Sequence, residues 1–244
     1  VAEQLLGGMG DPIGLITTLM DSSLLYRVEV ADTVHRFRTT STVARVLRMT
    51  DTPGADEARS LAIDQFALKL ARPDASRRVH MPGFSDLRQT LRGEIKNAMS
   101  WITALSEQGH TEDAVSLALS FAHLSSWDGQ KREALDMLLS CRDLVSSPND
   151  VCRLLSLAAE LGSQMQDAPT VDRLLRVLSS TAVNDGWIQA RLALTTMTVA
   201  IARGQLAKAE AVLDAAQSTD DPWLLNRVAQ NEHKLRAMRG ENEA

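Results

Sequence analysis

The segment Gly93 to Val115, "GEIKNAMSWITALSEQGHTEDAV", carries the side chains that could do chemistry in this chain: Glu94, Asn97, Trp101 and His110. A carboxylate, an amide and an imidazole close together are typical of acid–base sites. The same groups also form hydrogen-bonded joints between packed helices. Glu94, Asn97 and Trp101 are spaced three and four residues apart, so they share one face of a helix. We interpret Glu94 and Asn97 as residues that fix this helix against the preceding segment.

Motifs that would indicate catalysis or metal binding do not occur in the sequence, which has no HExxH, GxSxG, GxGxxG, GxxxxGK[ST] or EF-hand pattern. His110 and His123 fall on one predicted hairpin, but no carboxylate completes a zinc spacing with them. Cys141 and Cys152 lie eleven residues apart and match no CxxC pattern, so we expect reduced, partly buried thiols. We therefore expect no catalytic residue, no cofactor and no metal site in this chain. A cryptic all-α enzyme would require polar side chains that converge in one pocket.

Composition favours a soluble helical protein. The chain has 244 residues, 44% of them hydrophobic and 23% charged, with a net charge of −5. The charge is uneven, with +1 over residues 1–99 and −6 over residues 100–244, although segment 69–96 is locally basic. Such an acidic second half is unfavourable for binding nucleic acid. The longest run without a charged residue, Ala114 to Trp127, is too short to span a membrane, and we expect a cytoplasmic protein.

Helical periodicity governs the chain from Ser85 onward. Short polar linkers separate the helices, which predicts antiparallel helical hairpins. Turns near Gly129, Gln166 and Gly204 lie 37 and 38 residues apart, close to the period of a tetratricopeptide repeat. The small residues that such a repeat needs at its turns and packing positions are Gly129, Ala134, Gly204 and Ala209.

The first 80 residues have a different pattern. Asp11 and Pro12 open an amphipathic helix that we expect to run to Leu25. Apolar and polar residues then alternate around a turn at Ala31–Asp32, which predicts a β-hairpin. A further helix follows over residues 41–49. Helix, hairpin and helix together are the outline of a winged-helix unit.

Three segments in this order resemble the region that follows the ATPase module in bacterial STAND signal-transducing regulators of the AfsR and large LuxR type. "LITTLMDSSLL" resembles a helix that ends in Asp-x-Ser-Leu-Leu, "VHRFRTTSTV" resembles the wing hairpin, and "GEIKNAMSWITAL" resembles the segment that opens the repeats. The chain departs from the usual Arg-Tyr-x-x-x-Glu-Thr-Val pattern in the hairpin. The resemblance implies a winged-helix unit over 1–80 and repeats over 81–244. Because the chain begins at Val1, we expect it to be a portion of a longer protein whose NTPase module lies elsewhere.

The function implied by the resemblance is signal sensing and protein interaction in transcription regulation. The repeats would bind a protein partner, a peptide or a small molecule in a groove, and the winged helix would relay the signal to the ATPase module. The expected groove surface comprises Gln164, Gln189, Arg191, Thr195 and Thr198.

Two other functions stay open at this point. One is DNA binding by the winged-helix unit, which the absence of Lys and Arg from the helix over 11–25 disfavours. The other is a scaffold that associates with a second copy of itself.

Overall fold

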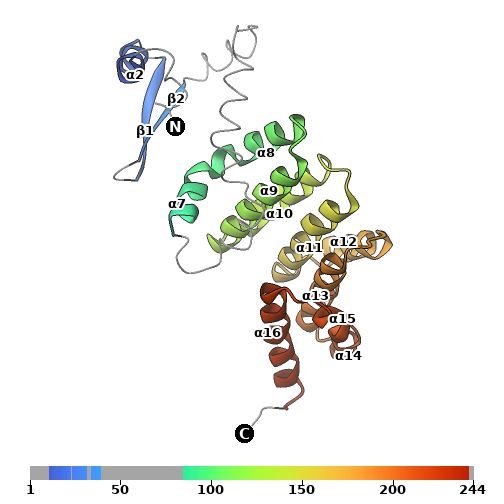
Figure 1. Ribbon diagram of the computed structural model, residues 1–244. Coiled ribbons are helices and arrows are strands. Elements are labelled where there is room, and N and C mark those ends of the chain that lie inside the picture. The colour runs from blue at the N-terminus through green and yellow to red at the C-terminus, as the bar shows by residue number, and fades with distance from the viewer. Residues whose placement is uncertain (1–10, 23, 32–33, 40–84, 242–244) are drawn as a thin grey trace. The chain divides into compact units, whose positions relative to one another are not determined.

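The structure, a computed structural model, describes residues 11–22, 24–31, 34–39 and 85–241 (Figure 1). The described part of the chain is mostly helical, as the sequence predicts. The chain divides into two compact units, Val1–Lys69 and Leu70–Ala244, where the sequence predicts 1–80 and 81–244.

The first unit begins with helix α2 (Pro12–Asp21), followed by strands β1 (Leu25–Ala31) and β2 (Val34–Thr39). The Asp11 carboxylate accepts a hydrogen bond from the Gly14 amide and caps the helix, with Pro12 in its first turn. The two strands pair antiparallel as a hairpin. The sequence prediction of a helix to Leu25 is wrong, because the alternating residues from Leu25 onward pair with β2. The helix expected over 41–49 lies outside the described residues.

The second unit is a succession of helices with short connections (Figure 1). In chain order they are α7 (Ser85–Glu94), the 3₁₀ segment η2 (Ile95–Asn97), α8 (Ala98–Glu107), α9 (Thr111–Trp127), α10 (Lys131–Arg142), α11 (Pro148–Gln164), α12 (Ala168–Ser180), α13 (Gly186–Ala202), α14 (Leu206–Ala211), α15 (Leu213–Gln217) and α16 (Pro222–Met238). The single helix expected from Leu206 to Ala216 is divided at Val212, where the backbone leaves helical geometry.

Two kinds of helix alternate in this unit. Helices α9, α11, α13 and α16 contact one another in sequence, and we call them the first helices. Helices α10, α12 and the pair α14 and α15 each pack against the first helix that precedes them. Helices α9, α11 and α13 therefore each have a returning partner on one side and the next first helix on another.

Turns with positive φ follow the first helices at a regular period. Gly129, Gly204 and Gly240 have φ values of 83°, 69° and 75°, and Gln166 has 59° at the equivalent turn. The sequence predicted turns near Gly129, Gln166 and Gly204 from the polar linkers there. A left-handed residue after the helix allows its last carbonyls to be satisfied before the chain reverses.

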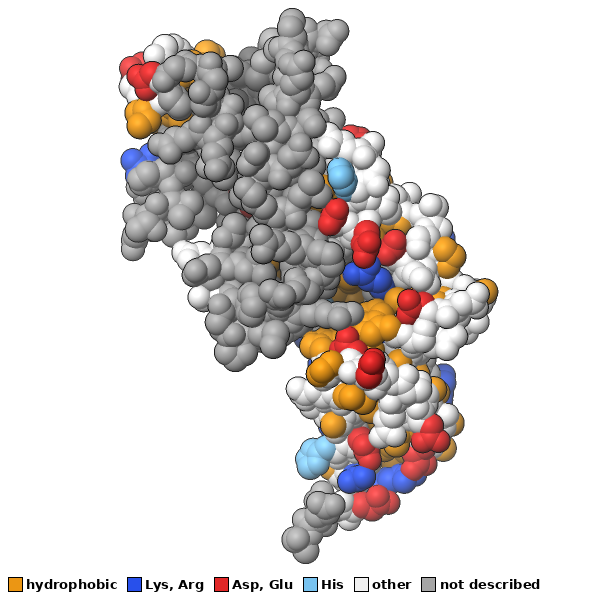
Figure 2. Space-filling model, in the orientation of Figure 1, with side chains coloured by type: hydrophobic (Ala, Val, Ile, Leu, Met, Phe, Trp, Pro, Cys, Tyr) orange, Lys and Arg blue, Asp and Glu red, His pale blue; other side chains and the backbone are white. Residues whose placement is uncertain are grey.

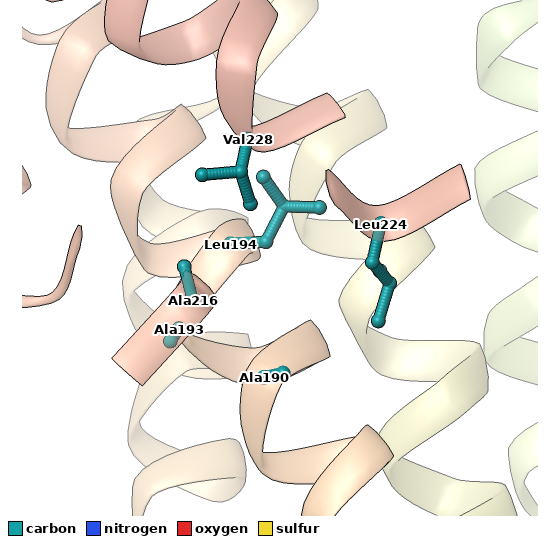
Figure 3. Close-up of a cluster of buried hydrophobic side chains, with 6 residues drawn as sticks. All are labelled: Ala190, Ala193, Leu194, Ala216, Leu224 and Val228. Atoms are coloured by element: carbon teal, nitrogen blue, oxygen red, sulfur yellow. The ribbon is translucent and has the colours of Figure 1, made fainter. Parts of the chain in front are cut away.

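Small residues allow close packing between helices, and aliphatic side chains fill the remaining space. One cluster joins α13, α15 and α16 (Figure 3), and its members are Ala190, Ala193, Leu194, Ala216, Leu224 and Val228. A second cluster joins α13, α14 and α16 and contains Ala200 and Ala209. Ala134 and Ala209, which the sequence assigned to close packing, are both fully buried.

Candidate functional site

The Glu94 carboxylate lies at the joint between α7 and α8. Its Oε2 accepts hydrogen bonds from Asn97 Nδ2 at 2.9 Å and from Trp101 Nε1 at 3.1 Å. Glu94 is buried, and its donors follow it across the 3₁₀ turn η2. The bonds hold the turn at which the helix changes geometry. The interpretation of this segment as a structural joint agrees with these contacts, and α8 and α9 form the next hairpin around Gly109 (φ 84°).

The first helices carry side chains in a shared register. Asp185 and Asp221 are the N-caps of α13 and α16, and a tryptophan stands two residues after each of them, at Trp187 and Trp223. An aspartate cap stabilises a helix start by accepting exposed backbone amides. Asp221 also joins the two helices, because its Oδ1 accepts from the Trp223 and Leu224 amides while its Oδ2 accepts from Trp187 Nε1 at 3.0 Å.

Arginines occupy a second shared position. Arg153, Arg191 and Arg227 each stand six residues after the N-cap of α11, α13 and α16, respectively. We call these three residues the arginine row. Helices packed side by side with the same register place equivalent residues on one face, so the row runs across the first helices.

A buried carboxylate in α11 pairs with two members of the arginine row. Glu160 Oε1 lies 2.9 Å from Arg191 Nη2 and accepts from Thr195 at 3.2 Å, while Oε2 lies 3.4 Å from Arg227 Nη2. The side chains of Glu160 and Arg191 are 5% and 6% exposed, whereas that of Arg227 is 38% exposed. Burial lowers the pKa of Arg191, an effect that Glu160 opposes and Arg227 reinforces.

The charges around Glu160 do not balance. Two guanidinium groups share this one carboxylate, and the third member of the row, Arg153, pairs with Asp150 at 3.1 Å. Arg191 Nη1 and Arg227 Nε are buried nitrogens with no hydrogen-bond partner in the described part of the chain. A buried donor without an acceptor is unfavourable, so each of these nitrogens would be stabilised by an acceptor that the described chain does not supply.

A small pocket lies against Arg191. It has a volume of about 30 Å³, close to that of one or two water molecules. All four first helices contribute to it, and its lining residues are Leu119, His123, Arg153, Leu157, Trp187, Arg191 and Trp223. The Arg191 guanidinium stacks 5.1 Å from the centre of the Trp223 ring. We call this pocket the aromatic pocket.

A wider cleft of about 510 Å³ lies between α12, α13 and α14. Its rim is formed by exposed charged residues, including Asp172, which pairs with Arg203 at 2.6 Å. No buried side-chain nitrogen or oxygen without a partner, among those described, lines this cleft. It offers space but few features that would select a ligand.

The groove residues expected from the sequence have four different positions. Arg191 lines the aromatic pocket, whereas Thr195 is fully buried beside Glu160. Thr198 accepts a hydrogen bond from Asn231 Nδ2 at 2.8 Å and joins α13 to α16. Gln164 and Gln189 are exposed, and Gln189 bonds to the Val183 carbonyl, which lies in the connection before α13.

Sequence reasoning missed Glu160, Arg227 and both tryptophans of the pocket. The signal that could have found the tryptophans is the repeated pattern "NDGW" and "DDPW", 36 residues apart at the starts of α13 and α16. The members of the arginine row are 38 and 36 residues apart. No comparable pattern in the sequence indicates Glu160, because a single Glu in a predicted helix is expected to be exposed to solvent.

Both cysteines are buried and free. Burial raises the pKa of Cys141 to about 12. Burial likewise raises the pKa of Cys152, with a hydrogen bond to Thr181 acting in the opposite direction. Thiols in this protonated state are poor nucleophiles and poor metal ligands.

Within the described residues, no group of three or more His, Cys, Asp or Glu side chains is placed to hold a metal ion. The described helices also include none with the length and apolar character to cross a membrane. Acidic and basic side chains are interspersed over the visible part of the second unit (Figure 2).

Comparisons of the chain with family models, with curated proteins and with solved structures find no significant match.

Proposed function

We propose that the second unit is a tetratricopeptide-like region that binds a protein segment along its first helices, in a cytoplasmic bacterial regulator of the STAND type. The observation that carries this proposal is the aromatic pocket, to which all four first helices contribute side chains. Tryptophan and arginine are the residues most often found where binding energy is concentrated in protein interfaces. The regular αL turns support the repeat assignment.

The mechanism under this proposal is a shift between packed arrangements, with no bond chemistry in this chain. A segment bound across α9, α11, α13 and α16 would favour one relative arrangement of these helices. The winged-helix unit would relay that shift to an NTPase module in the parent chain. The resemblance of the segments from "LITTLMDSSLL" to "GEIKNAMSWITAL" supports this part of the proposal.

A peptide-selection experiment tests the binding function. A random heptapeptide phage library is panned on the purified chain, and hydrogen exchange is then measured with and without the enriched peptides. We expect protection of α9, α11, α13 and α16, with little change in α10 and α12. Protection confined to the helices that do not line the pocket would contradict the proposal.

A matched pair of tryptophan variants locates the binding surface. Trp223→Ala removes a ring from the aromatic pocket, and we expect it to weaken binding of the selected peptides at least tenfold, since a buried aromatic anchor contributes about 2 kcal/mol or more. Trp127→Ala is the control, because Trp127 is 46% exposed at the end of α9 and does not line the pocket. Equal loss in the two variants would argue against this surface.

The regulatory part of the proposal has its own test. The sequence upstream of Val1 in the parent gene should encode a phosphate loop of the form GxxxxGK[ST]. An unrelated catalytic domain in that place would overturn the assignment to a STAND regulator and leave the binding function to be judged separately.

DNA binding by the first unit is the alternative with a distinct signature. Helix α2 contains no Lys or Arg, is capped by Asp11 and ends in Asp21, and these two carboxylates would repel phosphates. Salt-dependent binding of duplex DNA by the purified chain would favour this alternative, and absence of binding at low salt would exclude it.

Self-association is the other alternative. The last helix α16 has exposed polar residues, typical of a terminal helix that faces water: Asn226, Gln230, His233 and Lys234. Polar residues predominate on this surface, although Leu225 and Met238 of the same helix are 39% and 50% exposed. Light scattering that gave twice the chain mass at micromolar concentration would support association instead.

A further inference from the structure

We infer that the aromatic pocket is a carboxylate subsite, in which Arg191 receives an Asp or Glu side chain of an acidic peptide that lies across the arginine row. This inference rests on the proposed binding function and adds the chemical class of the ligand. Three observations carry it: a donor without an acceptor, an excess of cations and the small size of the pocket.

The unsatisfied donor is the first observation. Arg191 presents one nitrogen, Nη2, to Glu160 at 2.9 Å, while Nη1 has no partner in the described structure although the side chain is only 6% exposed. Guanidinium groups bind carboxylates with two parallel hydrogen bonds or share their edges between two carboxylates. The contact with Glu160 uses one side of the group and leaves the other for a second acceptor.

The local charge is the second observation. The arginine row places three cations on the first helices, and their ion-pair partners are the two carboxylates Asp150 and Glu160. The remaining titratable residue that lines the pocket is His123 in α9, and Asp221 contacts Trp187 from the start of α16. Both oxygens of the Asp221 carboxylate accept hydrogen bonds, one from Trp187 and the other from two backbone amides.

The size of the pocket is the third observation. A volume of about 30 Å³ admits a single carboxylate group and excludes a nucleotide, a sugar or a phosphorylated metabolite. The rest of the ligand must therefore lie outside the pocket, on the face formed by the first helices. Neighbouring helices are about 8–10 Å apart, which an extended peptide covers in about three residues. An acidic segment thus passes several members of the arginine row, and Trp187 and Trp223 supply apolar contact beside the carboxylate.

The experiment uses peptides selected by panning on the full chain. Each enriched peptide is synthesised with its natural acidic residue and as a twin with Glu→Gln or Asp→Asn, and both are titrated by calorimetry. We expect a shared acidic position and at least tenfold weaker binding of the amide twin. Both peptides are titrated into the same unmodified protein, so a difference in affinity cannot come from a misfolded variant.

Variants assign the effect to Arg191. Arg191→Lys retains one positive charge for Glu160 but lacks the nitrogen that corresponds to Arg191 Nη1. Because that nitrogen is the proposed donor to the peptide carboxylate, we expect the acidic peptide and its amide twin to bind this variant equally. The control is Arg176→Lys, an exposed arginine that lines the wider cleft between α12 and α14. This variant should preserve the full tenfold difference.

The outcomes separate the two proposals. Selected peptides without a shared acid, or an Arg191→Lys variant that still discriminates against the amide twin, would overturn the carboxylate subsite and leave peptide binding intact. Failure to enrich any peptide above a library control would overturn both. Enrichment with the expected discrimination, lost in Arg191→Lys and kept in Arg176→Lys, would establish the subsite.

Discussion

At the scale of single residues, the two buried carboxylates Glu94 and Glu160 differ in how far away in sequence their hydrogen-bond and ion-pair partners lie. Glu94 finds both donors within seven residues and holds a local turn. Glu160 finds its partners in two other helices, 31 and 67 residues away in sequence. The first carboxylate therefore shapes one helix joint, and the second links three successive first helices.

Replacement of Glu160 should be costly. In Glu160→Ala the Arg191 guanidinium stays buried without its carboxylate, so we expect the free energy of unfolding to fall by about 3–5 kcal/mol. Urea denaturation followed by circular dichroism measures this loss. The matched control is Asp172→Ala, which removes a surface ion pair with Arg203 and should cost less than about 1 kcal/mol. Equal losses of unfolding free energy in the two variants would show that the buried Glu160–Arg191 pair contributes no more to stability than a surface ion pair.

The buried thiols make stability depend on alkaline pH. The pKa of Cys141 is raised to about 12 from an ordinary value of 9.0, so above pH 9 the unfolded chain loses a proton that the folded chain keeps. Stability is therefore intact below pH 9 and falls as pH rises toward 12, with a slope of up to about 1.4 kcal/mol per pH unit from this group. Comparing denaturation of the wild type and Cys141→Ala at several pH values isolates the effect. Identical slopes in the two proteins would contradict it.

At the scale of elements, polar caps and left-handed turns shape the helix ends of the second unit. The caps Ser147, Asp185 and Asp221 accept backbone amides at the starts of α11, α13 and α16. At Asp167, the cap of α12, hydrogen bonding from Thr170 lowers the carboxyl pKa. These local devices depend on residues within a few positions of one another, so the sequence already predicts them.

The left-handed turns give a matched pair of predictions. Gly204→Ala should cost about 1–2 kcal/mol, because φ is 69° there although no atom lies within 4 Å of the added carbon. Gln166 occupies the equivalent turn with φ 59°, so Gln166→Gly should leave stability unchanged or raise it by up to about 1 kcal/mol. Thermal unfolding measures both. A loss on Gln166→Gly comparable to that of Gly204→Ala would mean that the glutamine side chain supports its turn.

At the scale of the whole molecule, the second unit is held by contacts between neighbours. Helix α11 contacts α9, α10, α12 and α13, whereas the main contacts of α16 are with α13 and α15. In such an array the stability of each helix depends on its own neighbours, so terminal helices open more readily. The Glu160 cluster partly offsets this because it connects α11 directly to α16 through Arg227.

Hydrogen exchange should reveal that gradient. We expect the amides of α16 to exchange faster than those of α11, because α16 lies at the edge of the packed array. Arg227→Ala should increase exchange in α16 while leaving α9 and α10 unaffected, as a check that the effect is local. Uniform exchange from α9 to α16 would indicate that the array opens as a single cooperative unit.

The sequence by itself determined the parts of this protein that depend on near neighbours. Helical periodicity, capping residues and the polar linkers between helices predict the helices and their reversals, because each of these signals acts over a few residues. The 37- and 38-residue spacing of the turns repeats this local pattern along the chain. The end of α2 was misplaced, since pairing of Leu25 with Thr39 in the hairpin overrides the local helical pattern.

Only the tertiary structure decided which polar residues form the site. From the sequence, Thr195 and Thr198 were expected on a groove surface, and packing places the first beside Glu160 and the second against Asn231. Conversely, Trp187, Trp223 and Arg191 come together because α13 and α16 pack side by side, a contact between residues more than thirty positions apart. Spacing predicts which face of one helix a residue occupies, but the partner of that face is fixed by how the helices pack.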